Sequence, residues 1–270
     1  CSRRGIVACS EEHPLLMSNG KLKRAKNIRV NDVLAEPVPM ASGSDAPIVP
    51  FDPIGCGPAA TDNFKIHVTS DLAYLLGLFY GDGECGTSIG ISFGGRPEFF
   101  PWQDIVVESI QKCGFDTILD RTAWDSEVDG AKTLKSGPFN GTQIRGSSGN
   151  VTFGSTRVQD IFIQLGAIKL TSETGLGRQR SLQIPTWLFN ANEATKRNFL
   201  AGWFDTDGSV KNGCMSGCTK SWTFAQDLCV LLSSIGVDYA IKPGWNVDYK
   251  KWYYTIILSI HHSWGFRDFL

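Results

Sequence analysis

The sequence predicts an α+β protein built from two similar halves, with a small β segment in front of them. The stretch LLGLFYGDG at residues 75–83 is echoed by LAGWFDTDG at residues 200–208. Each stretch has apolar residues at helical spacing and ends in Asp-Gly, and each is followed by alternating strand-like and helix-like segments. Two such matches, 125 positions apart, indicate a duplicated structural unit.

Four segments follow from the composition and the patterns. Residues 1–36 contain short apolar runs around a Ser18-Asn19-Gly20 turn, which is typical of a small β unit. Residues 37–66 are rich in proline, glycine and serine and are predicted to be a linker. The first half of the duplication then covers residues 67–185, and the second half covers residues 186–270.

Each half is predicted to begin with its motif helix. Ser70 or Asp71 is the expected N-cap of the first helix, and Asn190 or Asn192 that of the second. The first half continues with strands at 87–93, 116–121 and 143–153 and helices at 98–113 and 155–165. The second half continues with strands at 209–220, a helix at 221–235 and a hairpin at 238–260.

The two motif helices are predicted to pack against each other. Gly77 and Gly81 are four residues apart, as are Gly202 and Thr206. Each helix therefore presents small residues along one stripe, where a second helix backbone can approach closely. The simplest partner for either stripe is the other helix.

Each motif helix is predicted to end at an aspartate. Gly83 and Gly208 suit the left-handed conformation just past a helix C-terminus, which places Asp82 and Asp207 in the last turns. A carboxylate is disfavoured there, because the C-terminal end of the helix dipole is negative. Parallel packing would bring both acids to one end, so a cation is expected between them. Mg²⁺, which prefers oxygen ligands and shares its waters with phosphates, fits best.

The two stretches resemble the paired motifs of the LAGLIDADG homing endonucleases. The resemblance implies two pseudo-symmetric α/β halves with curved antiparallel sheets that lie along the major groove of double-stranded DNA. It implies that Asp82 and Asp207 bind the divalent metal, helped by the backbone carbonyls of Gly81 and Thr206, and that each acid acts on one DNA strand. The implied activity is site-specific, metal-dependent hydrolysis that breaks both strands, carried out by a monomer.

One position departs from the family pattern. Relatives commonly carry a catalytic-site lysine two residues before an Ile-Pro pair, and here Leu182 stands at that position. Arg180 or Lys169 would then have to supply the cation near the metal, or the first site lacks one. A catalytically inactive nucleic-acid-binding protein is therefore an alternative.

The net charge of −1 gives no general excess of cations for phosphate contacts, so local clusters must supply them. The best candidate for DNA contact is the hairpin at 238–260, where lysines are interleaved with aromatic residues. The alternative is that its aromatic side chains pack inward and its lysines are merely exposed. The hairpin candidates are Lys242, Lys250 and Lys251, interleaved with Trp245, Tyr249, Trp252, Tyr253 and Tyr254. The candidates in the first half are Arg96, Arg121, Lys132, Lys135, Gln143 and Arg145.

Residues 10–34 resemble the block around the Thr-x-x-His motif of intein splicing domains, which have the all-β Hint fold. Ser10 stands where the family has threonine, and His13 would polarise the scissile peptide. Cys1 lies only twelve residues before His13 and is not expected to be the splice nucleophile, and no His-Asn pair stands at the end of the sequence. A self-splicing intein with a passenger nuclease, joined to flanking segments of a host protein, is the second alternative.

The eight cysteines include no paired Cys-x-x-Cys units, so reduced thiols and an intracellular location, cytoplasmic or nuclear, are expected. Cys214 and Cys218 are predicted to be free thiols, which we favour over a metal site. No window approaches eighteen continuous apolar residues, so no membrane partner is expected.

Overall fold

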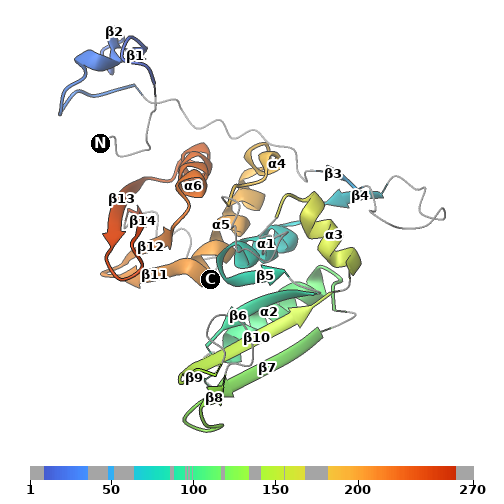
Figure 1. The fold of residues 1–270 in the computed structure, drawn as a ribbon. Helices are drawn as coiled ribbons and strands as arrows, with labels where there is room; N and C mark the ends of the chain where they lie inside the picture. Colours follow the sequence, from blue (N-terminus) through green and yellow to red (C-terminus); the bar gives the residue numbers. More distant parts are fainter. Residues whose placement is uncertain are drawn as a thin grey trace.

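The computed structural model describes residues 9–35, 48–51, 64–85, 88–94, 96, 98, 100–116, 119–133, 141–154, 156–167 and 182–259. These residues form the predicted α+β fold, with antiparallel sheets and a central pair of helices (Figure 1). Within these ranges, no helix has the length and apolarity that crossing a bilayer would need.

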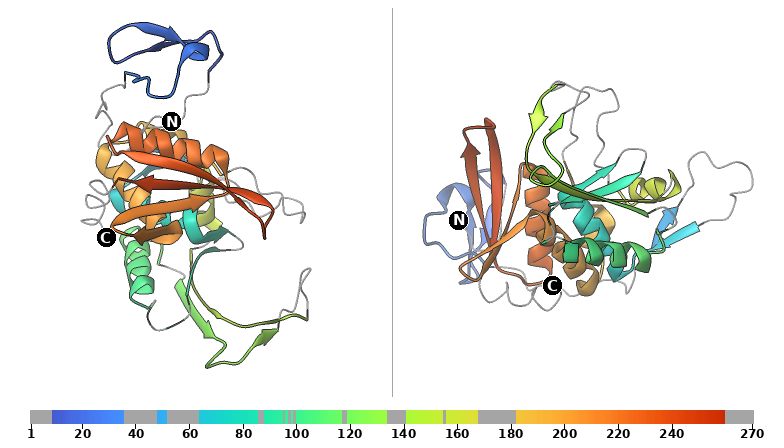
Figure 2. Two further views of the ribbon diagram at one scale, coloured as in Figure 1. Left: turned by 90° about the vertical axis from the view of Figure 1, so that its left-hand side faces the viewer. Right: turned by 90° about the horizontal axis from the view of Figure 1, so that it is seen from below.

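The duplicated unit is present in both halves. The first half contains α1 (Ser70–Asp82), β5 (Gly83–Cys85), β6 (Ile89–Phe93), α2 (Phe100–Lys112), β7 (Leu119–Asp125), β10 (Ser147–Phe153) and α3 (Thr156–Gln164). The second contains α4 (Thr186–Phe189), α5 (Glu193–Asp207), β11 (Gly208–Lys211), β12 (Cys214–Thr219), α6 (Trp222–Ser234), β13 (Tyr239–Asn246) and β14 (Lys251–Leu258). The sheet orders are β5-β6-β10-β7 and β11-β12-β14-β13, so each strand of one half has a counterpart in the other (Figure 2).

The halves differ where their long strands connect. The second half joins β13 to β14 through a short turn at residues 247–250. Between β7 and β10, the first half adds a small hairpin made of β8 (Lys132–Thr133) and β9 (Gln143–Ile144). The first sheet therefore carries an extension that the second lacks.

The predicted linker contains a pair of strands. β3 (Ile48–Phe51) and β4 (Phe64–His67) pair antiparallel within the segment predicted to be only connecting chain. The many prolines and glycines of this segment favour a connecting chain. Short apolar runs within it, around Ile48-Val49 and Ile66, nevertheless pair with each other.

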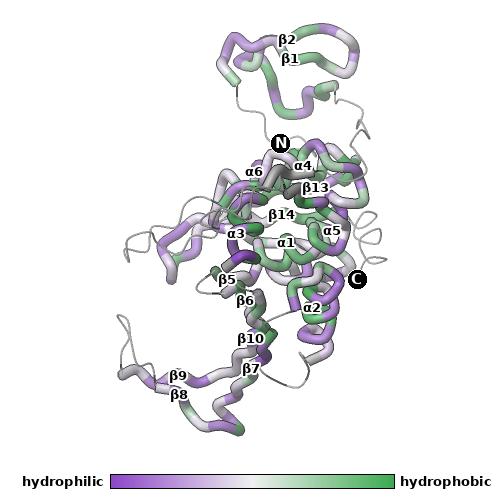
Figure 3. The backbone as a smooth tube through the Cα atoms, turned by 90° about the vertical axis from the view of Figure 1, so that its right-hand side faces the viewer, coloured by the Kyte–Doolittle hydropathy of each residue, from purple (hydrophilic) through white to green (hydrophobic). Residues whose placement is uncertain are grey.

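The N-terminal segment is a small β unit that lies apart from the two halves (Figure 3). β1 (Pro14–Leu16) pairs with β2 (Leu22–Arg24), and a 3-10 turn, η1 (Ala25–Asn27), follows. Gly20 has a φ of +78°, as the predicted turn requires. Residues 1–8 of the predicted β unit lie outside the described residues.

Side-chain caps set the start of both motif helices. Asn192 accepts a hydrogen bond from the Thr195 N–H at 2.8 Å, which confirms one of the two predicted caps of α5. In α1 the cap is Thr69, whose Oγ1 accepts from the Leu72 N–H at 3.2 Å, so the prediction of Ser70 or Asp71 is wrong by one or two residues. Serine, threonine and aspartate compete as caps, and only the backbone geometry selects among neighbours.

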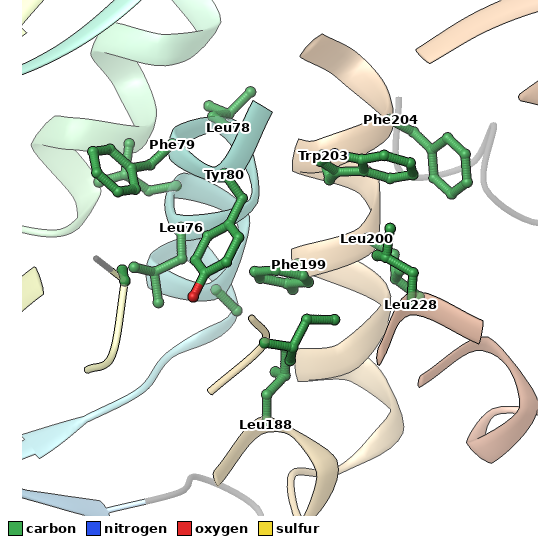
Figure 4. Packing of buried hydrophobic residues seen from close by; sticks show 14 of the residues in the cluster. Leu76, Leu78, Phe79, Tyr80, Leu188, Phe199, Leu200, Trp203, Phe204 and Leu228 are labelled. Carbon is green, nitrogen blue, oxygen red and sulfur yellow. The ribbon is translucent and has the colours of Figure 1, made fainter. Parts of the chain in front are cut away.

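The core is organised around α1 and α5, which are buried on nearly all sides. Tyr80 of α1 and Phe199 of α5 meet edge to face with their ring centroids 5.2 Å apart (Figure 4). The Tyr80 ring also stacks on Phe224 of α6 at 5.5 Å. Side chains from both halves thus share one continuous hydrophobic core.

Candidate active site

The stripe of small residues on α1 lies directly against the backbone of α5. A Cβ added at Gly77 would overlap the Phe199 carbonyl oxygen and would lie 2.8 Å from the Trp203 nitrogen. No side chain fits between these two backbones. The predicted close approach of the two helices is therefore confirmed from the side of α1.

The same contact recurs from the side of α5. A Cβ at Gly202 would overlap the Tyr74 carbonyl oxygen and lie 2.9 Å from the Leu78 nitrogen. Tyr74 and Leu78 are the residues 125 positions before the two that Gly77 meets. The interface is reciprocal, as a pseudo-twofold axis between the helices requires.

The helices are parallel, and their C-terminal ends meet. A Cβ at Gly81 would overlap the Thr206 hydroxyl and would lie 2.5 Å from the Thr206 Cβ and 3.4 Å from the Asp207 nitrogen. The next residue of α1 is Asp82, which is exposed, whereas Asp207 is partly buried. The two terminal aspartates therefore emerge from adjoining helix ends.

The glycines after the two aspartates do not adopt the predicted left-handed conformation. Gly83 has a φ of −77° and Gly208 a φ of −90°, because each helix passes directly into an extended strand. Glycine is needed there for a different reason. A Cβ would lie 2.6 Å from the Phe79 Cα at Gly83, and 3.0 Å from the Phe204 Cα at Gly208.

The two acids have different surroundings. The Trp203 Nε1–H donates a hydrogen bond to Asp207 Oδ2 at 3.2 Å, which orients that carboxylate. Leu78 occupies the equivalent position in the first copy, so Asp82 has no corresponding indole donor. The pseudo-symmetry of the backbone is therefore not matched by the side chains around the acids.

A partly buried polar pair that the sequence patterns do not reveal joins the first half of α1 to the last turn of α5. The Tyr74 hydroxyl of α1 donates to Asp205 Oδ2 of α5 at 2.7 Å. Burial raises the pKa of the Asp205 carboxyl to about 6, although the tyrosine hydrogen bond acts to lower it. Burial, followed by the charge of Asp205, raises the pKa of the Tyr74 hydroxyl. The pair joins the two halves across their interface, and no local pattern in the sequence indicates it.

Tyr80 connects α1 to two distant parts of the chain. Its hydroxyl lies 3.1 Å from the Gly166 carbonyl oxygen and 2.8 Å from that of Gln183, so its one O–H proton is shared between the two acceptors. The neighbouring Leu182 packs against the hydrophobic core, and its carbonyl accepts from Ser221 Oγ at 3.1 Å. The position at which the family pattern led us to expect a lysine therefore has a packing role here. The alternative cations, Lys169 and Arg180, lie outside the described residues.

The converging helix ends offer oxygen ligands for a divalent cation. The donor set comprises the carboxylates of Asp82 and Asp207 and the backbone carbonyls of Gly81 and Thr206, which suits a hard ion such as Mg²⁺. Within the described parts of the chain, no three histidine, cysteine, aspartate or glutamate side chains gather where they could hold a metal. An ion at this site would therefore depend on carbonyls, water and substrate oxygens for its remaining ligands.

The cysteines whose positions the structure describes are free thiols, and they include Cys214 and Cys218, as predicted.

The structure corrects the predicted position of Arg121. In an antiparallel sheet, paired residues point to the same face, and Arg121 pairs with the buried Val151. Its Nη1–H donates to Asp104 of α2 at 2.7 Å. Arg121 therefore lies on the helix-covered face, away from the open face that was predicted to meet DNA.

The other candidates in the first half lie beyond the sheet. Arg96 is engaged by Asp125 at 3.0 Å, and Lys132 Nζ lies 5.9 Å from the centre of the Trp124 ring. Arg145 is exposed and lines a surface hollow together with Arg96. Gln143 is exposed on β9, and Lys135 lies outside the described residues.

The candidates in the second half lie where a ligand can reach them. Lys242 and Lys251 are exposed on the open face of the second sheet, and Lys250 is exposed in the turn with a φ of +50°. Trp245 and Trp252 pair across the strands on the opposite face, 5.7 Å apart and each about half exposed. The lysines and these two tryptophans thus point to different sides of the hairpin.

Ser10 and His13 lie together in the N-terminal turn. The His13 N–H donates to the Ser10 carbonyl oxygen at 3.1 Å, and both residues are exposed. This hydrogen bond joins backbone atoms and involves neither the serine hydroxyl nor the imidazole. It gives the imidazole no partner that would fix its orientation.

Comparison with protein families gives a match for the second half. Residues 194–268 match the family described as LAGLIDADG-like domain. Among curated proteins, the tRNA-splicing ligase RtcB of Pyrococcus furiosus is 27% identical over 225 residues, an alignment that covers 76% of this chain and 21% of the ligase. The chain thus spans about a fifth of the length of the curated relative it matches.

Comparison with solved structures gives weaker likenesses. Mesophilic variants of the homing endonuclease I-DmoI align with a TM-score of 0.45 at 13% identity, over 74% of this chain and 93% of theirs. I-DmoI in complex with DNA and Mn gives a TM-score of 0.44 at 11% identity, over 74% of this chain and 94% of the I-DmoI chain. The N-terminal LAGLIDADG domain of DUF199/WhiA aligns with a TM-score of 0.39 at 12% identity, over 73% of this chain and 80% of that domain's chain.

Proposed function

We propose, on the premise that residues 194–268 are a LAGLIDADG-like domain, that this chain is a site-specific endonuclease that cuts both strands of duplex DNA. One observation carries the proposal. Two parallel helices in reciprocal backbone contact bring Asp82 and Asp207 to adjoining ends. A pair of symmetry-related acids suits a substrate whose two strands are themselves related by a twofold axis.

Each acid would serve one strand. Asp82 and Asp207, with the carbonyls of Gly81 and Thr206, would hold Mg²⁺ or a similar divalent ion. When bound, such an ion lowers the pKa of an attacking water and stabilises the charge that develops on the phosphate oxygens. The chain's own contribution is to fix the two carboxylates, through the helix contact and, for Asp207, through the Trp203 indole.

The proposal favours a monomer, because one chain supplies both members of the acid pair. No second copy is needed to complete the site. Cleavage of cellular DNA requires an intracellular location, which we propose together with the activity. Lys169 and Arg180 remain the proposed sources of a cation near the first acid, since Leu182 is held by packing.

We further propose that the chain derives from an intein. The match to a fifth of a much longer ligase is the pattern expected of a segment inserted into a host protein, and ligase activity itself is not proposed for this chain. The N-terminal β unit with Ser10 and His13 would then be a remnant of a splicing domain. Mass spectrometry of a fusion that carries the native flanking segments tests splicing: excision with joining of the flanks would support it, and an intact fusion would contradict it.

Single substitutions test the nuclease proposal. The substrate is a plasmid that carries the uninterrupted host coding sequence, incubated with the protein and Mg²⁺, with EDTA as the metal-free control. Wild-type protein should give linear plasmid, Asp207→Asn should give a nicked circle, and Asp82→Asn should nick the opposite strand. DNA binding in EDTA should persist in both variants.

Two results would contradict this assignment. If either variant still linearises the plasmid, the acids do not act on separate strands. If wild-type protein binds the site without cutting at any divalent-ion concentration, the alternative of an inactive DNA-binding protein replaces the nuclease.

A further inference from the structure

We infer that the two sheets contact DNA by different chemistry: the open face of the second sheet binds the phosphate backbone, whereas the strands of the first sheet place no cation on their open face. The inference rests on the proposed function, because it takes duplex DNA as the partner. It concerns binding and does not require cleavage.

The open face of the second sheet carries three lysines and no acid. Lys211 pairs with Cys214, Lys242 with Thr255 and Lys251 with Asn246, and all three lysines point away from the side that holds the buried Ile256. Each is exposed. Strands β11 to β14 contain no aspartate or glutamate at all.

The charges of these lysines are not neutralised by acids of the described part of the chain. None of Lys211, Lys242 and Lys251 has an ion-pair partner within the part of the chain that the structure describes. The acids next to the β13–β14 hairpin strands are Asp238, directly before β13, and Asp248, in the turn with Lys250. Three exposed ammonium groups on one open sheet suit a polyanion.

The open face of the first sheet has the opposite charge. Glu84 pairs with Gly90 and Asp120 with Thr152, which places both acids on the side opposite the buried Ile91 and Val151. Both acids are exposed. The only cation on strands β5, β6, β7 and β10 is Arg121, which points to α2.

Hydroxyl and amide groups share this face with the indole of Trp124, which pairs with Ser148. Asn150 Nδ2–H donates to Glu84 Oε1 at 2.9 Å, in the space that Gly90 leaves open. The remaining polar side chains there are Ser92, Thr122, Ser148 and Thr152. Such groups can hydrogen-bond base edges, but they release no counterions from DNA. Among the described residues of the first half, Lys132 and Arg145 have no acidic partner; they lie on the β8–β9 extension and its flank, and Lys132 Nζ reaches the Trp124 ring, 5.9 Å from its centre.

The consequence is measurable without a known target sequence. Each phosphate neutralised by a cation contributes about 0.9 to the slope of log Kobs against log salt concentration. The probe is a random 30-base-pair duplex, titrated in EDTA between low and physiological salt. We compare wild-type protein with the triple variant Lys211→Gln, Lys242→Gln, Lys251→Gln.

A matched control removes the same net charge elsewhere. It carries Lys112→Gln, Arg121→Gln and Arg157→Gln, all on helices or on the helix-covered face. We expect the triple lysine variant to lose about two to three units of slope, and the control less than about one. Replacing the same three lysines by arginine should restore the wild-type slope, which excludes misfolding as the cause.

The outcomes separate this inference from the proposed function. Equal losses in the two charge-matched variants, or an unchanged slope in the lysine variant, would overturn the unequal roles of the sheets while leaving DNA binding intact. Absence of binding by wild-type protein at low salt would overturn the proposed function itself.

Discussion

Replacing Gly202 by alanine tests the contact on which the paired acids depend. The added Cβ would overlap the Tyr74 carbonyl oxygen and lie 2.9 Å from the Leu78 nitrogen. Both atoms belong to the backbone of α1, so no rotamer change can relieve the overlap. The helices must separate by roughly 1 Å, which loosens the packing on both sides of the interface.

The magnitude follows from two opposing terms. Overpacking a core typically costs about 1–3 kcal/mol, and a contact of backbone with backbone lies at or above the upper end of that range. Alanine has a helix propensity about 1 kcal/mol more favourable than that of glycine, which offsets part of the loss. We expect the free energy of unfolding to fall by about 2 kcal/mol.

Urea denaturation monitored by tryptophan fluorescence measures this change, and cleavage of the plasmid should fall with it. A contrasting pair of variants supplies the control. Gly81→Ala overlaps the Thr206 side chain instead of backbone, so adding Thr206→Gly should recover most of the stability that Gly81→Ala loses. A Gly202→Ala protein as stable as wild type would refute the close backbone contact.

Two further substitutions probe the polar groups of the interface. The pKa of the Asp205 carboxyl is raised to about 6 in the folded protein. The protonated carboxyl therefore stabilises the fold below about pH 4, and this stabilisation is lost as the pH rises through 6. Thermal denaturation from pH 4 to 7 should show a decline in stability for wild type, of which Asp205→Asn removes up to about 3 kcal/mol. Parallel pH profiles for wild type and variant would contradict the burial of this carboxyl. Tyr80→Phe leaves two carbonyls without their hydroxyl donor and should cost about 1–3 kcal/mol in urea denaturation, whereas Tyr249→Phe, at an exposed tyrosine, should cost nothing measurable. Equal stabilities of these two variants would show that the Tyr80 hydrogen bonds contribute little.

The sequence by itself determined the features that depend on local patterns. The repeated motif predicted two halves, and the four-residue spacing of Gly77 and Gly81 predicted a close helix contact, because side-chain position along a helix follows directly from spacing. The order of the main helices and strands within each half and the Asn192 cap were predictable for the same reason. Asp82 and Asp207 could be identified as candidate metal ligands because an acid at a helix C-terminus is disfavoured and requires a partner of positive charge.

Only the tertiary structure decided which side chains share a surface. The sequence predicts that Arg121 contacts DNA, but the strand register places its side chain on the face that carries Asp104. A shift of one residue in register would move the side chain to the other face, and the sequence does not show the register. The contact between Tyr74 and Asp205 joins residues far apart in the chain and leaves no local trace. The conformations of Gly83 and Gly208 depend on the strand that follows each helix and on how closely the chain packs there, which helix-end composition alone cannot show.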